Sequence, residues 1–160
     1  MSKRIANIIS RIYRHPTAGR QAIALSRADA EQVPLLPGVA MISITAPERL
    51  PANLPPYEHL LRISFSDVEF LSKDLTARAR KKLSEAMSTS QASELISYVG
   101  GLPDSIHTLL VHCEGGYSRS CGVVAALGKL FEYQVEAERL MKANQSVQTM
   151  LIMVANNHRR

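Results

Sequence analysis

The sequence predicts an α/β fold in which a twisted, largely parallel central sheet carries helices on both faces. The first observation is that apolar, β-branched runs alternate with longer segments of helical periodicity, as in strands joined by crossover helices. The second is the composition: 46% hydrophobic and 21% charged residues over 160 positions are typical of one ordinary globular domain. This composition excludes disordered chains and disulfide-rich scaffolds.

The N-terminal segment is basic and amphipathic. Four isoleucines recur at helical spacing within residues 2–13, and no acidic residue precedes Asp29. We therefore divide the chain into a basic N-terminal arm or helix, residues 1–20, and a single domain, residues 21–160, that holds the remaining motifs. The arm could contact an anionic partner, or it could pack on the domain with its charges in solvent.

Short apolar runs between proline and glycine breaks predict the strands. Residues 21–25 form a short apolar segment, and four prolines make residues 47–56 a loop. The three predicted strands are residues 39–44, 59–65 and 106–112.

Apolar residues at helical spacing predict the helices that pack on the sheet. The longest predicted helix spans residues 71–87, where leucines recur on one face and Arg and Lys on the other. Ser26 opens a small helix with a pattern that resembles a capping box. The other expected helices span residues 91–99, 119–131, 135–142 and 147–156.

The segment whose side chains could carry out a reaction lies between the third predicted strand and the next helix. Its sequence is His-Cys-Glu-Gly-Gly-Tyr-Ser-Arg-Ser. Gly115 and Gly116 let successive backbone N–H groups turn toward an anion at a helix N-terminus. Arg119 can bind two phosphoryl oxygens with its planar guanidinium. These surroundings favour the thiolate form of Cys113, and Ser120 can donate a hydrogen bond to its sulfur.

This segment resembles the signature loop of the protein tyrosine phosphatases, Cys-x5-Arg followed by Ser or Thr, and fits the dual-specificity subgroup. The resemblance implies a phosphotyrosine-phosphatase-like fold. It also implies a hydrolase that acts on phosphotyrosine of proteins, with phosphoserine and phosphothreonine as further candidates, through a phosphocysteine intermediate and without metal or cofactor. Cys113 would attack phosphorus and His112 would order the loop. The phosphoryl oxygens would be bound by Arg119 and the backbone of Glu114, Gly115, Gly116, Tyr117 and Ser118.

The reaction also needs an acid to protonate the leaving oxygen. In the family this is an Asp on a loop after an earlier strand, which matches Asp67 here, although Asp67 lies 46 positions before Cys113, a wider gap than most relatives have. The alternative for Asp67 is a residue that stabilises the start of a helix. Asp74 is expected inside a helix with Arg78 as its partner, and Asp104 at the opposite end of the sheet.

Three further residues have open roles. Cys121 could form a disulfide with Cys113, or be a small core residue. Asn144 and Gln145 could brace the loop or position water. His112 is not expected to bind metal, because no second ligand lies at ligand spacing.

Two other classes of function remain open. One is a phosphate-binding pseudophosphatase, a binding module without efficient turnover; the other is sulfur or arsenate chemistry on a similar cysteine loop. A formal charge of +5 with only 5% aromatic residues gives little reason to expect nucleic acid as a partner. No apolar stretch is long enough to span a membrane, and two cysteines with no secretory signal pattern predict a cytoplasmic location.

Overall fold

The computed structural model describes residues 2–158 and contains a four-stranded sheet in which every neighbouring pair is parallel. The α/β prediction is therefore confirmed. The strands lie in the order β1 (Gln21–Ser26), β4 (Thr108–Cys113), β2 (Val39–Thr45) and β3 (Leu60–Ser64). Because all four run the same way, the loops that follow them meet at one edge of the sheet.

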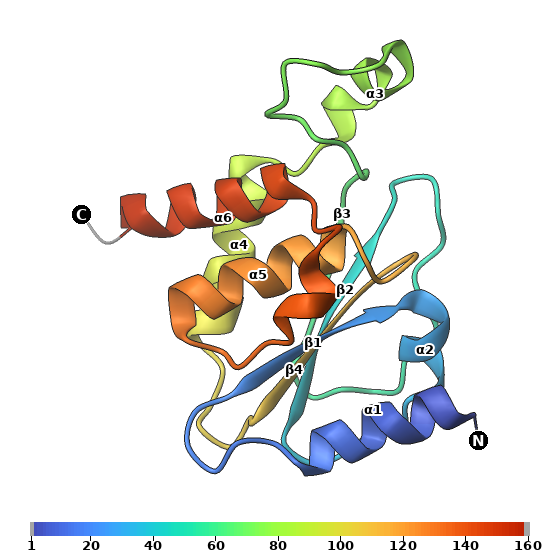
Figure 1. Ribbon diagram of the computed structural model, residues 1–160, viewed down its shortest axis with the longest axis vertical. Coiled ribbons are helices and arrows are strands. Elements are labelled where there is room, and N and C mark those ends of the chain that lie inside the picture. The colour runs from blue at the N-terminus through green and yellow to red at the C-terminus, as the bar shows by residue number, and fades with distance from the viewer. Residues whose placement is uncertain (1, 159–160) are drawn as a thin grey trace.

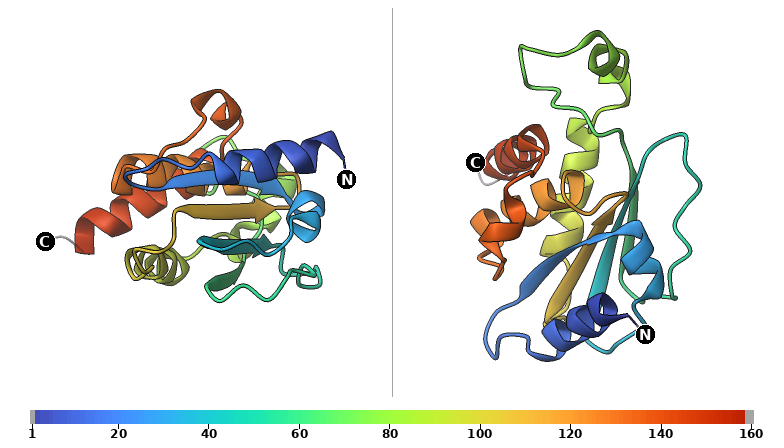
Figure 2. Two further views of the ribbon diagram at one scale, coloured as in Figure 1. Left: turned by 90° about the horizontal axis from the view of Figure 1, so that it is seen from below. Right: turned by 45° about the vertical axis from the view of Figure 1, so that its right-hand side comes forward.

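Helices cover both faces of the sheet (Figures 1 and 2). One face packs against α4 (Thr89–Gly100), α5 (Arg119–Phe131) and α6 (Gln145–His158). The other packs against α1 (Lys3–Tyr13) and α2 (Arg27–Gln32). Strand β2 shows why both layers form, because Ile42 and Ile44 point into the first core and Met41 points into the second.

The N-terminal segment forms a helix that packs on the domain. Ser2 caps α1 by accepting a hydrogen bond from the Ile5 N–H, and Ile5, Ile8 and Ile12 are buried in the second core. The apolar face of this helix is therefore already occupied. None of the helices in residues 2–158 combines the length and apolar character that crossing a membrane requires.

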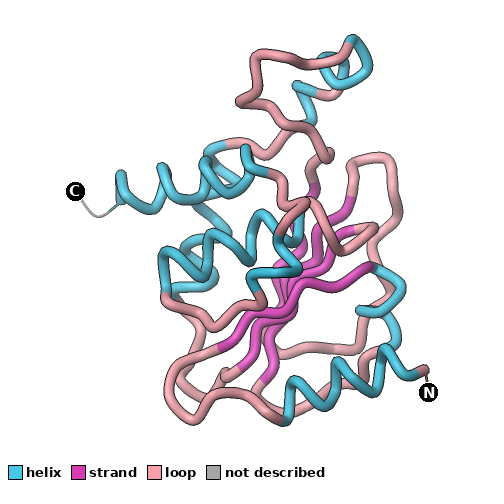
Figure 3. Tube along the Cα trace, in the orientation of Figure 1, coloured by secondary structure: helices cyan, strands magenta, loops and turns pink. Residues whose placement is uncertain are grey.

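The prediction of a long helix over residues 71–87 is wrong. This segment holds only α3 (Ala77–Lys81) and one 3₁₀ turn, η1 (Leu83–Glu85), and Figure 3 draws most of the rest as loop. Most of the expected apolar face is not covered by another element: Leu71 and Leu83 are 48% and 40% exposed, and only Met87, at its end, joins the core. Ser88 then starts α4 with a capping box completed by Gln91.

Two other elements differ from expectation. The segment at residues 21–25, not assigned as a strand, is the edge strand β1, paired along its whole length with β4. The helix expected over residues 135–142 is a single 3₁₀ turn, η2 (Ala137–Leu140).

Candidate active site

The candidate phosphate-binding loop joins the central strand β4 to α5. Cys113 is the last residue of β4, and Arg119 is the first residue of α5. Ser118, at the N-cap position, makes no side-chain capping bond to the helix. The first turn of α5 therefore presents backbone N–H groups that no side chain of the cap satisfies, which is the arrangement found at anion-binding helix ends.

Cys113 is buried within this loop, with a side chain that is close to two hydrogen-bonding groups. Its Sγ accepts a hydrogen bond from the Gly116 N–H at 3.3 Å and lies 3.2 Å from the Ser120 hydroxyl oxygen. The thiol can donate to that hydroxyl, whereas a thiolate would accept from it. Both groups can therefore stabilise negative charge on the sulfur.

Arg119 is only 6% exposed and is held in a fixed position. Its Nη1 donates a hydrogen bond to the Phe65 carbonyl oxygen at 2.9 Å, which ties the loop to the segment after β3. Its Nε is buried and has no hydrogen-bond partner within residues 2–158. A buried guanidinium N–H without a partner is costly, and a bound oxyanion would satisfy it.

Asp67 reaches the loop from the segment after β3. Its Oδ1 accepts hydrogen bonds from the Ser118 hydroxyl at 2.8 Å and from the Asn144 side-chain amide at 2.9 Å. The residue itself is exposed, and within residues 2–158 its Oδ2 makes no hydrogen bond. The carboxyl group is thus next to the loop, with one oxygen oriented by the protein and one available.

The segment that carries Asp67 is fastened to the start of α6. Glu69 accepts hydrogen bonds from the backbone N–H groups of Gln145 and Ser146, both at 2.8 Å, and from the Ser146 hydroxyl. A carboxylate at a helix N-terminus is favourable because the N–H groups there carry partial positive charge. Asn144 adds a bond to the Val68 carbonyl oxygen. Asn144 therefore braces the segment that carries Asp67, and the Gln145 backbone N–H helps to hold the same segment through Glu69.

His112 lies beneath the loop and is fully buried. Its Nδ1 is 3.3 Å from the Cys113 carbonyl oxygen, which can only accept, so Nδ1 carries the proton and Nε2 accepts from the Ser43 hydroxyl at 2.6 Å. Burial lowers the pKa of His112, which keeps the imidazole neutral. This neutral ring connects β4 to β2 directly behind Cys113.

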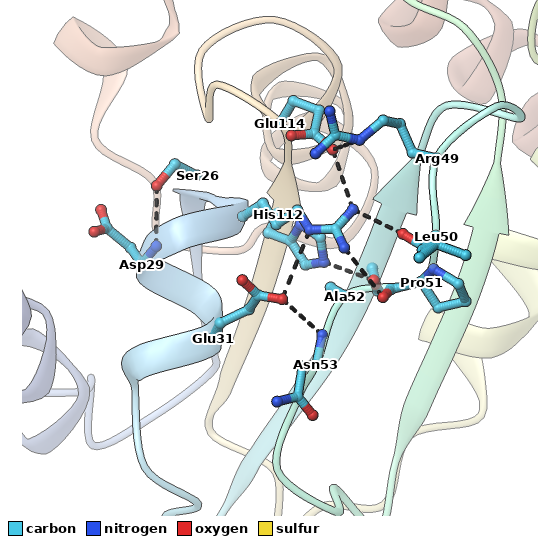
Figure 4. Close-up of polar contacts among 12 residues, drawn as sticks. Ser26, Asp29, Glu31, Arg49, Leu50, Pro51, Ala52, Asn53, His112 and Glu114 are labelled. Carbon is cyan, nitrogen blue, oxygen red and sulfur yellow. Dashed lines mark hydrogen bonds and ion pairs between the residues drawn. The ribbon is translucent and has the colours of Figure 1, made fainter.

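Arg27 is a residue of the site that no sequence pattern predicted. Of the groups that it contacts, Figure 4 labels Leu50, Pro51 and Glu114. The Arg27 backbone N–H donates to the Glu114 carbonyl oxygen, and its guanidinium contacts the Glu114 carboxylate at 3.2 Å and the carbonyl oxygens of Leu50 and Pro51. Arg49 lies 3.6 Å from the same carboxylate. Two arginines thus offset the negative charge of Glu114 at the edge of the candidate phosphate-binding loop.

The remaining candidates lie elsewhere. Cys113 and Cys121 are both free thiols, so no disulfide joins them here. Asp104 projects into solvent before β4, at the opposite end of that strand from Cys113. Asp74 is exposed, and no Asp74–Arg78 ion pair forms because the expected helix does not reach it. Tyr117 is 57% exposed, with the Lys142 ammonium above its ring.

No family model, curated protein or solved structure matches this chain. The chemical interpretation therefore depends on the residues of the loop and their surroundings. Within residues 2–158, no group of three or more His, Cys, Asp or Glu side chains could hold a metal ion.

Proposed function

We propose that this protein is a cysteine-dependent phosphomonoester hydrolase with a phosphatase-like fold. Its proposed substrates are phosphotyrosine side chains of proteins or peptides, and phosphoserine or phosphothreonine as further members of the same class. The observation that carries the proposal is the hydrogen bond between Asp67 and Ser118, which holds a carboxyl group against a Cys-x5-Arg loop. A module that only bound phosphate would not need that carboxyl group.

The reaction would proceed in two steps. The Cys113 thiolate attacks phosphorus and forms a P–S bond while the P–O bond to the leaving group breaks, and protonated Asp67 gives its proton to the departing oxygen. Water then attacks the phosphocysteine, with the Asp67 carboxylate accepting its proton, and the P–S bond breaks to release inorganic phosphate. The guanidinium of Arg119 and the backbone N–H groups of the loop would stabilise the charge on the phosphoryl oxygens throughout.

The first test is hydrolysis of p-nitrophenyl phosphate in the presence of EDTA and a reductant. We expect turnover by the wild type and none above background for Cys113→Ser. Wild-type-like turnover by Cys113→Ser would exclude the cysteine mechanism. Clean, folded wild type that binds phosphate without turnover would instead support the binding-module alternative.

The second test separates acid catalysis from simple binding. Nitrophenolate leaves without protonation, whereas the phenol oxygen of tyrosine needs a proton. We therefore expect Asp67→Asn to reduce kcat/KM on a phosphotyrosine peptide about 100-fold and on p-nitrophenyl phosphate only a few-fold. Asp74→Asn is the matched control, since Asp74 is an exposed carboxylate on a nearby segment and forms no ion pair within residues 2–158. Equal losses on both substrates for Asp67→Asn would refute its role as the acid.

A further inference from the structure

Residues 72–84, here called the projecting segment, extend away from the body of the protein. Figure 1 shows α3 and its loops above β3, at the edge where the strands end, and the right view in Figure 2 shows the same. Every residue of the segment is exposed or only partly buried. None of its residues belongs to either hydrophobic core, so the segment does not serve to fill the interior of the protein.

The projecting segment is strongly basic. Its five cations are Lys73, Arg78, Arg80, Lys81 and Lys82, against one acidic residue, Asp74. Within residues 2–158, none of these five cations forms an ion pair. Elsewhere arginines do pair, as Arg11 does with Glu136. The segment therefore holds positive charge that the protein itself does not neutralise.

Both ends of this segment are fixed beside Asp67. On one side, the Leu71 N–H donates to the Ser146 hydroxyl at 3.0 Å. On the other, the Ser66 N–H donates to the Glu85 carbonyl oxygen at 2.8 Å, and its hydroxyl donates to the Glu85 carboxylate. The cations thus extend from the same short stretch of chain that carries the proposed acid.

We propose that the projecting segment binds acidic residues that flank the phosphorylated side chain of a protein substrate. This inference rests on the proposed function and adds a substrate preference to it. Unpaired cations at the rim of a site attract anionic segments and lower KM without changing the chemical step. A peptide fits better than a membrane surface, because α3 has the sequence Ala-Arg-Ala-Arg-Lys and carries no large apolar side chain. The two leucines of the segment lie outside this helix, where Leu75 is partly buried and Leu83 is 40% exposed.

The test compares two triple variants that remove the same number of charges. Arg78→Gln/Arg80→Gln/Lys81→Gln changes exposed cations of the projecting segment. The control, Lys3→Gln/Arg14→Gln/Lys129→Gln, changes exposed cations of α1, its C-cap and α5. The substrates are p-nitrophenyl phosphate and two phosphotyrosine peptides, one flanked by Glu and one by Gln. For the first variant we expect KM on the acidic peptide to rise about five- to tenfold and kcat to stay constant.

The other combinations define the outcome. The first variant should keep wild-type kinetics on the neutral peptide and on p-nitrophenyl phosphate, and the control variant should keep them on all three substrates. The rise in KM should disappear at about 0.5 M NaCl, because exposed charges are screened. An equal loss on all substrates, or no loss on the acidic peptide, would overturn the proposal. If the first variant kept wild-type kinetics on both peptides but lost binding to phosphatidylserine vesicles, the segment would bind membranes and the proposal would also be overturned. Absence of p-nitrophenyl phosphate turnover by the wild type would refute the proposed function instead.

Discussion

Cys113 and Cys121 are two buried thiols that lie on either side of the same residue, Gly116, and their surroundings are opposite. Cys113 accepts a hydrogen bond from the Gly116 N–H, whereas Cys121 donates to the carbonyl oxygens of Gly116 and Arg139. N–H donors favour negative charge on sulfur, and carbonyl oxygens oppose it. Burial, reinforced by nearby Cys113, raises the pKa of Cys121 to about 11. Both thiols are buried, so what distinguishes the candidate nucleophile is the polarity of the groups that bond its sulfur: an N–H donor at Cys113, and carbonyl acceptors at Cys121.

The largest expected difference is between the two Cys→Ser variants. Cys113→Ser should lower kcat/KM on a phosphotyrosine peptide by at least about 10⁴-fold, because no other group can form the covalent intermediate. Cys121→Ser should stay within about threefold of wild type, since a hydroxyl can make the same donations. Steady-state kinetics measure both, and a similar loss in the two variants would remove the distinction between the thiols.

Arg119→Lys tests the guanidinium on the Cys113 side. We expect kcat/KM to fall about 10²- to 10³-fold, because an ammonium cannot bind two phosphoryl oxygens and also reach the Phe65 carbonyl oxygen. Inhibition by inorganic phosphate should weaken in parallel. Arg139→Lys, on the Cys121 side, is the control and should change kcat/KM by less than about twofold. If the two substitutions had the same effect, the loop would not be the phosphate site.

Gly116→Ala tests the residue between the two thiols. Gly116 has a φ of 80°, and an added Cβ would lie 2.4 Å from the Ser26 nitrogen. We expect a loss of about 2–3 kcal/mol in the free energy of unfolding and about a tenfold lower kcat/KM, because the loop must move.

Gly19→Ala is the control for that variant. Its φ of 81° is nearly the same, but nothing lies within 4 Å of the added Cβ. It should cost only about 1 kcal/mol and leave activity unchanged. Chemical denaturation and kinetics together separate the two, and equal effects would show that backbone strain alone is responsible.

The smallest expected effect concerns His112, which supports the Cys113 side from beneath. Because burial lowers its pKa, the unfolded chain binds a proton more readily than the folded protein. This contribution to stability is present above the ordinary His pKa of about 6.5 and is lost as the pH falls below it, by at most about 1.4 kcal/mol per pH unit. In urea titrations between about pH 7.5 and 5.5, His112→Gln should show a shallower pH dependence than wild type. An unchanged slope would contradict the assignment of a neutral buried ring.

Strands buried on both faces were the easiest part of the fold to predict. Residues 39–44 and 106–112 are mainly apolar, and the strands found there, β2 and β4, are the two central strands of the sheet. The helix predicted over residues 71–87 was wrong because its apolar face is largely unburied, and apolar residues at helical spacing stabilise a helix only where another surface covers them. At the edge of the sheet, β1 contains small alanines and a terminal glutamine, which carry little strand signal.

The candidate site also has a part that could be predicted from the sequence and a part that could not. The loop could be predicted because its nine residues are contiguous, so chain connectivity alone brings Cys113 and Arg119 together. Asp67 could be proposed from its place after a strand, but its partners Ser118 and Asn144 lie 51 and 77 positions away. No sequence pattern indicated a role for Arg27, because its guanidinium donates largely to backbone carbonyl oxygens, and these are present whatever the sequence.

The hydrogen bonds of the acid segment also have a consequence for how the protein is made. Asp67 and Glu69 depend on Asn144 and on the first residues of α6, which leave the ribosome long after β3. During synthesis the central strands and the Cys-x5-Arg loop can assemble first, when Ser118 is already present to bond Asp67 but Asn144 and the start of α6 are not. On the proposed mechanism, a nascent chain would form its phosphate-binding loop before the segment that carries Asp67 was fully braced, and the complete support of the acid would arrive only with α6.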